Sequence, residues 1–343
     1  MLDIIIPVYN TPTHDIERCL KNLNKIKKLN KIIIIDDGSK QETAEFLDKY
    51  VKNNKLYLLK HVENGGVSKA RNIGLNFAKS EYVMFIDSDD SIEAEAVNKA
   101  CKYMTEHKLD VIIGGSNIVY NDKIISKKTS FNKIKIYESE ELLKVKDRIY
   151  SGKYKKSNFE LKNIYLARIH AKIFNRNKFN KIRFDETLPL SEDSLFSIDL
   201  AMESKRIGVI DDIMYNYYQN EYSVLHRKNN YKDIVNLVSF SNALFERAKL
   251  VEDKNLYDSL IMRILGVRMT NVKKILKIKQ KKLFLEFLDE YYTPIEYKMF
   301  KINQYNLTII ERLFTLFFKL PYKIQKIILK ITYLFINNGG KDE

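Results

Sequence analysis

The sequence predicts an α/β fold, with a mostly parallel central sheet flanked by helices and an all-helical C-terminal region. In the first 120 residues, near-continuous runs of Ile and Val alternate with segments of helical periodicity. Such runs are typical of parallel strands that are covered on both faces. From about residue 231, Leu, Ile and Phe recur every three or four residues, which is the spacing of amphipathic helices.

Strands and helices are expected to alternate strictly in the first part. We expect strands at 2–9, 31–37, 55–62, 82–89 and 109–120. We expect helices at 14–26, 40–54, 66–80 and 93–108. Elements that alternate at this spacing form right-handed βαβ units, and the ligands of such sheets bind beyond the carboxyl ends of the strands.

The pattern loosens from about residue 121 to 185 into segments rich in Lys, Tyr and Asn. A loop and helix at 184–205 and a strand at 206–220 then restore regular structure. We therefore expect one domain at 1–225, with halves at about 1–120 and 121–225. A helical region at 226–343 follows, which is a candidate for membrane association or oligomerisation.

Composition indicates a folded protein that needs an anionic partner. Apolar residues make up 45% of the 343 residues and charged residues 30%, and the net charge is +15. That charge favours nucleic acid, anionic lipid or a phosphorylated substrate. No signal peptide and no membrane-spanning segment is recognisable, and Cys19 and Cys101 read as reduced, buried thiols. These features favour a cytoplasmic protein.

The stretch YVMFIDSDD runs from a buried strand directly into three carboxylates, Asp87, Asp89 and Asp90. Like charges this close repel and raise one another's pKa. A hard cation such as Mg²⁺ or Mn²⁺ takes oxygen ligands and would relieve the repulsion. The alternative is a helix N-cap, because acidic residues also suit the start of a helix.

The stretch ENGGVSKARNIGL places Gly65 and Gly66 before a helix that carries Lys69 and Arg71. Glycines let the backbone approach an anion closely, and a helix N-terminus beside an Arg favours phosphate. The alternative is an ordinary loop-to-helix turn with a solvated Arg.

Two further acidic pairs follow expected strand or loop ends. Asp36 and Asp37 end a strand, and can accept hydrogen bonds from a base N–H or ribose hydroxyl, or form a turn and cap. Glu192 and Asp193 precede an amphipathic helix. They can supply a general base for an incoming hydroxyl, or Ser191 and Asp193 can merely cap the helix.

Five of these stretches together resemble a known family. IIIPVYN, IIIIDDGS, NGGVSKARNIGL, YVMFIDSDD and LSEDSLF occur in the order and at about the spacing seen in family-two inverting glycosyltransferases of the GT-A fold, of the bacterial surface-polysaccharide type. The resemblance covers about residues 1–220. It implies that 1–120 forms a nucleotide-binding half and 121–225 an acceptor half.

The resemblance also implies a role for individual residues in binding a UDP-sugar. Pro7, Val8 and Tyr9 resemble the residues that hold the uracil, with Asp37 or Asp36 at its ring N–H. The remaining nucleotide-sugar contacts that it implies are Gly66, Arg71, Asp87 and Ser88.

For metal and catalysis, the resemblance implies three further assignments. Asp89 resembles the direct ligand of Mn²⁺ or Mg²⁺, with Asp87 as a second contact. Asp193 resembles the catalytic base, and Glu192 beside it resembles a residue that orients a hydroxyl.

The expected reaction moves a hexose or N-acetylhexosamine from a UDP-sugar to a hydroxyl of a cell-surface glycan or lipid-linked acceptor, with inversion. The processive members of the family typically carry a Q-x-x-R-W motif, and this chain has no Trp. We therefore expect a non-processive enzyme. Near the place of that motif, His226 could close over the diphosphate or its metal, or lie solvated beside Arg227.

The C-terminal segment 307–336 is amphipathic on both sides of Pro321. Lys323, Lys326 and Lys330 share a helical face, and Ile and Leu residues fill much of the remainder. Such helices lie in the plane of an anionic membrane surface, here the inner face of the cell membrane. The alternative is a helical bundle or a homo-oligomer interface.

Two other function classes compete with a sugar transferase. Paired Asp residues also hold the metals of nucleotidyl and phosphoryl transferases, but the P-loop motif is absent. A non-enzymatic, basic nucleic-acid-binding protein fits the charge, but no nucleic-acid-reading module is recognisable, and we expect no nucleic-acid partner.

Overall fold

The computed structural model describes residues 1–120, 123–124, 134–152, 166, 168–219, 231–292, 313 and 316–338. The chain divides into two compact units. The first comprises 1–149 and 158–226, and the second comprises 150–157 and 227–343. The predicted domain boundary after residue 225 lies outside the described residues and stays a prediction.

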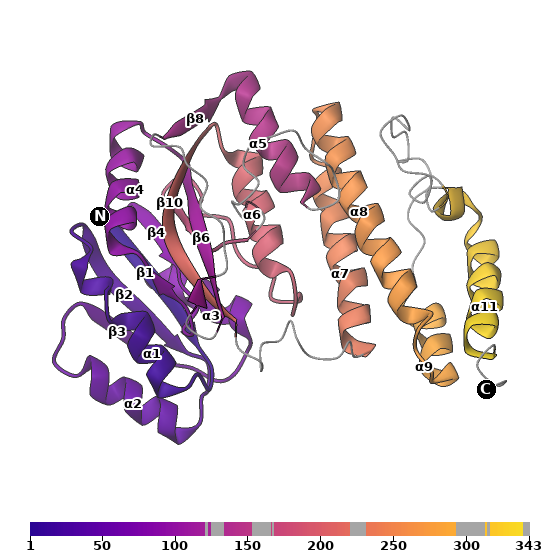
Figure 1. The fold of residues 1–343 in the computed structure, drawn as a ribbon, viewed down its shortest axis with the longest axis horizontal. Helices are drawn as coiled ribbons and strands as arrows, with labels where there is room; N and C mark the ends of the chain where they lie inside the picture. Colours follow the sequence, from indigo (N-terminus) through magenta and orange to yellow (C-terminus); the bar gives the residue numbers. More distant parts are fainter. Residues whose placement is uncertain are drawn as a thin grey trace. The chain divides into compact units, whose positions relative to one another are not determined.

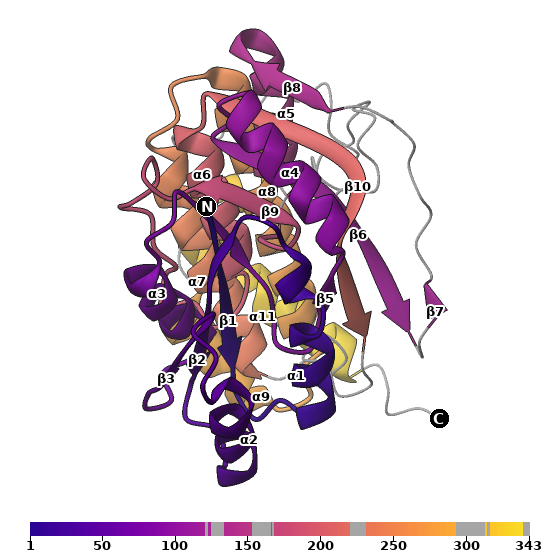
Figure 2. The same cartoon turned by 90° about the vertical axis from the view of Figure 1, so that its left-hand side faces the viewer.

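The first unit is built on one sheet, which Figures 1 and 2 show from two directions. Its strands are β1 (Leu2–Val8), β2 (Leu29–Asp36), β3 (Tyr57–His61), β4 (Tyr82–Phe85), β5 (Ser91–Ile92), β6 (Val111–Tyr120), β7 (Lys123–Ile124), β8 (Lys135–Glu138), β9 (Lys172–Asn175) and β10 (Arg206–Gln219). Its order is β3-β2-β1-β4-β9-β6-β10-β5, with β7 beside β6 and β8 beside β10.

The parallel part of the sheet is the part that the sequence predicts. Strands β3, β2, β1 and β4 run parallel, and so do β6 and β10. Strand β9 lies antiparallel between β4 and β6 and joins the two parallel groups. Strands β5, β7, β8 and β9 were not expected, because each is only two to four residues long and lacks a clear alternating pattern.

Helices cover both faces of this sheet. They are α1 (Thr13–Leu20), the short η1 (Leu23–Lys25), α2 (Gln41–Val51), α3 (Val67–Phe77), α4 (Ala94–Glu106), α5 (Ser139–Ser151) and α6 (Glu192–Glu203). Ile4 and Ile6 of β1 join a core with α1, α2 and α4. Ile5, between them, faces Gly74 of α3 on the other side. Because both faces are buried, β1 carries no polar alternation, as its apolar run predicts.

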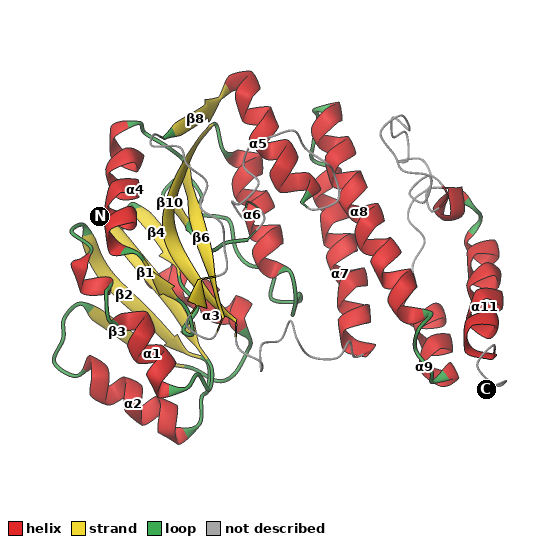
Figure 3. Cartoon of the chain, viewed as in Figure 1, coloured by secondary structure: helices red, strands yellow, loops and turns green. Residues whose placement is uncertain are grey.

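The second unit is helical in the part that the structure describes, as Figure 3 shows by colour. Its elements are α7 (Tyr231–Ala248), α8 (Lys254–Ile275), α9 (Lys281–Glu286), a π-helical turn η3 (Phe287–Tyr291) and α11 (Tyr322–Asn338). Asp253 caps α8 by accepting a hydrogen bond from the Leu256 backbone N–H. Among the described helices of either unit, none combines the length and apolarity that a membrane span requires. Cys19 and Cys101, in the first unit, are buried free thiols, as predicted.

A buried carboxylate fixes the first strand to its neighbours. Asp3 is fully buried and accepts hydrogen bonds from the backbone N–H groups of Lys79 and Ser80, at 2.7 and 2.8 Å. The Ser80 hydroxyl and the Asn30 side-chain amide donate to it as well, at 2.9 and 2.8 Å. Asp3 therefore ties the turn before β4 to both β1 and β2.

We expect Asp3→Ala to lower the free energy of unfolding by about 2–4 kcal/mol, because buried donors lose their acceptor. Urea unfolding followed by circular dichroism measures this. The exposed Glu17 on α1 offers a control, and Glu17→Ala should shift the free energy by less than about 0.5 kcal/mol. Equal urea midpoints for the two variants would contradict the role given to Asp3.

Candidate functional site

The carboxyl ends of β1, β2 and β4 meet at one edge of the sheet. Pro7 pairs with Ile35, and Val8 pairs with Asp36, so the predicted base-holding residues do lie beside the predicted acidic pair. Pro7 and Val8 are buried, while the ring of Tyr9 is 55% exposed just beyond the strand. An exposed ring at a strand end is a surface on which a planar base can stack.

Asp36 and Asp37 are buried and shape this edge through hydrogen bonds within the chain. Asp36 accepts from the Ser39 backbone N–H at 3.1 Å and from His61 Nδ1 at 2.7 Å. Asp37 accepts from the backbone N–H groups of Gly65 and Gly66, both at 2.8 Å. Asp37 thus holds the glycine turn against the end of β2.

Gly66 stands directly before α3 with a φ of +89°, in the region that favours glycine. A Cβ added there would meet no atom within 4 Å, so the residue borders open space. The predicted glycine turn therefore lies at a helix N-terminus that is open to an incoming anion.

Arg71 of α3 lies at the centre of the site and is almost completely buried. One guanidinium nitrogen donates to Glu192 Oε1 and another to Asp87 Oδ1, both at 2.8 Å. Burial alone would lower the pKa of Arg71, but the two carboxylates raise it, so the guanidinium stays charged. Arg71, which was predicted to contact the nucleotide, therefore joins Asp87 of the predicted metal-binding turn to Glu192 of the predicted catalytic pair.

His170 is a site residue that the sequence analysis missed. Its Nε2 donates to Asp87 Oδ2 at 2.9 Å, and its ring stacks on Tyr215 with centroids 4.9 Å apart. It comes two residues before β9, and because β9 runs antiparallel to β4, its start lies where β4 ends. The sequence could have indicated this position for His170 only if KIFN, residues 172–175, had been recognised as a short strand.

The three acidic residues after β4 have different environments. Arg71 and His170 hold the pKa of Asp87 well below the usual carboxyl value, although burial alone would raise it. Burial and the charge of Asp87 raise the pKa of Asp89 to about 6. Asp90 is fully buried, and accepts from the Tyr215 hydroxyl at 2.6 Å and the Tyr218 N–H at 2.8 Å.

This turn is anchored by its neighbours. The Ser88 hydroxyl shares a hydrogen bond with that of Thr11 at 2.6 Å, and Arg18 donates to the Asp89 carbonyl oxygen. Both interactions join the predicted metal turn to the segment that follows β1. The carboxylate of Asp89 is left out of these bonds.

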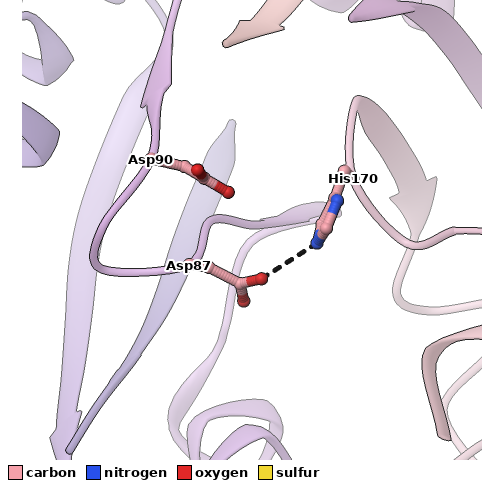
Figure 4. A group of neighbouring side chains, drawn as sticks. All are labelled: Asp87, Asp90 and His170. Carbon is pink, nitrogen blue, oxygen red and sulfur yellow. Dashed lines mark hydrogen bonds and ion pairs between the residues drawn. The ribbon is translucent and has the colours of Figure 1, made fainter. Parts of the chain in front are cut away.

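The donor set fits a divalent cation. One atom each of Asp87, Asp90 and His170 lies within 4.8 Å of the others, and Figure 4 shows their arrangement. Asp90 is fully buried, whereas Asp87 and Asp89 are only partly buried, so Asp87 and Asp89 are the more accessible oxygen ligands. Burial and the charge of Asp87 raise the pKa of Asp89, and the charge of Arg18 opposes this only in part, so a bound cation would favour the ionised form. The identity of the ion, Mn²⁺ or Mg²⁺, stays a prediction.

Glu192 and Asp193 begin α6 directly after Ser191, whose φ of +68° is left-handed. That backbone conformation is uncommon outside glycine and is found where surrounding structure imposes it, often at functional sites. Burial and the charge of Asp193 raise the pKa of Glu192, although Arg71 opposes this. The carboxylate of Asp193 accepts only from the next backbone N–H, of Ser194, at 2.6 Å in the part of the chain that the structure describes.

Lys172 lies buried near this pair. Burial lowers its pKa to about 7, while the charge of Asp193 acts in the opposite direction. His226, predicted to close over the diphosphate, lies outside the described residues.

Residues 3–183 match the family described as "Glycosyl transferase family 2". The chain belongs to glycosyl transferase family 2. Its predicted family membership is therefore confirmed.

Curated relatives support the assignment. An uncharacterized glycosyltransferase of Bacillus subtilis, EpsJ, is 25% identical over 65% of this chain and 62% of its own length. The poly(ribitol-phosphate) beta-N-acetylglucosaminyltransferase TarS of Staphylococcus aureus is 30% identical over 62% of this chain and 35% of its own. The chain thus spans less than two thirds of the length of either relative.

The predicted fold is confirmed by solved structures. The crystal structure of S. aureus TarS 1–349 in complex with UDP-GlcNAc has a TM-score of 0.68. It covers 100% of this chain and 93% of that one, at 20% identity. This chain and TarS 1–349 therefore share the fold, an α/β sheet followed by a helical C-terminal region.

We expect Arg71→Met to lower the free energy of unfolding by about 3 kcal/mol, because it removes a buried cation from two partly buried carboxylates. Lys102→Met supplies the control, since Lys102 pairs with Glu106 on the exposed surface of α4 at 3.6 Å. That surface pair should contribute less than about 1 kcal/mol. Urea unfolding measures both variants, and a matched loss in the two would refute a structural role for Arg71.

Proposed function

We propose that the protein is a metal-dependent, inverting, non-processive glycosyltransferase. It moves a hexose or N-acetylhexosamine from a UDP-sugar to a hydroxyl of a cell-surface glycan or lipid-linked acceptor, at the cytoplasmic face of the membrane. The observation that carries the proposal is the two-armed contact of Arg71, which joins the acidic turn after β4 to the carboxylate pair of α6. This contact would bring the residues that bind the UDP-sugar next to the residue that activates the acceptor hydroxyl.

The donor side is supported by the strand ends. Tyr9 offers an exposed ring to a base, and Asp37 holds the Gly65–Gly66 turn at the N-terminus of α3. A helix N-terminus attracts phosphate oxygens. The TarS structure with UDP-GlcNAc makes UDP-GlcNAc the first donor to test.

The departing diphosphate is stabilised by opposite charge at the turn after β4. A divalent cation held by Asp87 and Asp89 would stabilise the negative charge that develops on the departing diphosphate. Arg71 keeps Asp87 ionised and fixed in place, and His170 secures the other oxygen of the same carboxylate. Both partners orient the ligand carboxylate before any nucleotide arrives.

Asp193 is the better base of the α6 pair. Glu192 is tied to Arg71 at 2.8 Å, so its charge is already compensated. Asp193 is bonded only to the adjacent backbone N–H within the described chain, which leaves an oxygen to accept a proton from an attacking hydroxyl. The hydroxyl then attacks the anomeric carbon from the face opposite the diphosphate, and a single displacement inverts the configuration.

The acceptor proposal rests on the relatives and on charge. TarS and TarP of S. aureus are named as poly(ribitol-phosphate) beta-N-acetylglucosaminyltransferases, and GgaB of B. subtilis as a minor teichoic acid biosynthesis protein. A net charge of +15 suits an acceptor that carries phosphate or is anchored on an anionic surface.

Asp193→Asn tests the base. We expect sugar transfer to fall at least about a thousandfold, while the dissociation constant of the UDP-sugar changes less than about threefold. UDP release and calorimetric binding measure the two quantities. Glu203→Gln, an exposed change at the other end of α6, should alter neither. Equal loss of transfer and binding would show that the base is misassigned, and release of pyrophosphate would indicate a nucleotidyl transferase.

Asp89→Asn tests the cation. We expect about a tenfold weaker binding of UDP in Mn²⁺ and no difference from wild type in EDTA, because the lost carboxylate acts only through the ion. Titration calorimetry under both conditions measures this. Glu95→Gln, an exposed change on α4, serves as the control. UDP binding by wild type that is unaffected by EDTA would argue against metal dependence.

A further inference from the structure

Helix α11 packs on the second unit through a narrow stripe. Gln325, Leu329 and Tyr333, spaced four residues apart, are buried. The Tyr333 ring stacks on Phe284 with centroids 4.0 Å apart, and the Tyr292 hydroxyl donates to Gln325 Oε1 at 2.6 Å. This stripe uses only one side of the helix.

The remainder of α11 presents large aliphatic side chains to solvent. Their exposed fractions lie between 36% and 55%. The exposed aliphatic residues are Ile324, Ile327, Ile328, Ile331, Leu334 and Ile336. All of them except Ile336 recur at three- or four-residue spacing on one face of the helix, and these five form a continuous strip, called the aliphatic strip below. A row of this kind is unusual on a soluble surface, where exposed apolar residues are normally scattered.

Lysines border the aliphatic strip. Lys323 and Lys330 are exposed, while Lys326 pairs with Asp289 at 3.0 Å. Residues 322–338 contain three Lys and no acidic residue. Over residues 271–336, 13 Lys and Arg stand against 5 Asp and Glu. The apolar surface is therefore set in a strongly positive segment.

A basic cavity adjoins the same helix. The Tyr333 hydroxyl donates to the Lys279 carbonyl at 3.2 Å, and Asn337 donates to that of Leu276 at 3.1 Å. These contacts place the end of α11 against the segment that lines a cavity of about 640 Å³. Among the described residues, its lining includes Lys273, Lys274, Lys277 and Lys279 and no acidic side chain. Such a concentration of lysines attracts phosphate groups.

We propose that α11 docks the protein on an anionic lipid bilayer, with its aliphatic strip in the boundary between headgroups and acyl chains. The lysines beside the strip meet the lipid phosphates. Helices with an apolar face and a lysine border bind in this way, parallel to the surface. The attachment that we propose is peripheral, because a helix of this kind lies in the plane of the interface.

Charge favours a bilayer over a second copy of the chain as the occupant of the strip. Two copies of α11 packed face to face would bring their lysines together with no acidic residue on either helix to pair with them. Anionic lipid supplies the missing negative charge. The strip lies in the second unit and the residues proposed to bind the UDP-sugar lie in the first, so variants can test the two separately.

Flotation of the full-length protein with lipid vesicles tests the proposal. We expect the protein to float with vesicles of phosphatidylcholine and about 30% phosphatidylglycerol, and to bind pure phosphatidylcholine at least about tenfold less. Ile327→Gln combined with Ile331→Gln should reduce binding to the anionic vesicles about tenfold or more, because the apolar contact is lost. Lys323→Glu combined with Lys330→Glu should have a similar effect.

Leu250→Gln is the matched control. Leu250 is a 70% exposed aliphatic residue of the second unit that does not belong to α11, and its change should leave vesicle binding intact. Circular dichroism should show wild-type unfolding for every variant, and UDP binding should be unchanged, which separates docking from donor chemistry.

Two results would overturn the proposal. The first is wild-type protein that does not float with anionic vesicles, or an isoleucine double variant that floats as well as wild type. The second is a wild-type dimer in light scattering that the isoleucine variant abolishes while vesicle binding persists, which would assign the strip to a second copy.

Discussion

The site depends on one buried guanidinium. Arg71 lies on α3, yet its two arms reach Asp87 after β4 and Glu192 at the start of α6, which are 105 positions apart along the chain. The guanidinium is the buried charge, and the two partly buried carboxylates compensate it from either side. The proposed metal turn and the proposed base are therefore positioned by the same side chain, so their spacing is fixed before ligands bind.

The negative charges of the acidic residues after β4 are compensated by their neighbours to different extents. Asp87 has two partners and a lowered pKa, Asp90 is enclosed by two tyrosine contacts, and Asp89 has a pKa raised to about 6. The same contrast recurs at α6, where Glu192 is paired and Asp193 is not held by a cation at hydrogen-bond distance in the described chain. At α6, the carboxylate with the fewer internal bonds is the one assigned as base, because an oxygen already engaged cannot readily take a proton. In the turn after β4, Asp87 is assigned to the metal although Arg71 and His170 bond its two oxygens.

Sequence patterns predicted the parts of the fold that rest on local periodicity. The apolar runs of β1 and β2, the glycine turn and the acid-rich exit from β4 were all recognisable, because each is specified by neighbouring residues. The place of His170 was not, since it depends on the antiparallel pairing of β9 with β4. The turn from Asp36 to Ser39 is one of the two roles that the sequence offered for this pair. The contacts to His61, Gly65 and Gly66 were hidden, because these donors come from β3 and from the loop after it.

The position of β9 between β4 and β6 has a consequence for the connection that leads to it. Residues 111–113 of β6 pair with residues 172–174 of β9, and β6 pairs with β10 as far as Tyr120, so both ends of the intervening stretch are anchored in the sheet. Changes of length or sequence between them need not disturb the strands that shape the donor edge, because the entropic cost of a longer connection grows only slowly. Insertions in this connection would therefore leave β1, β2 and β4 in their present register, and with them the acidic residues at the ends of β2 and β4.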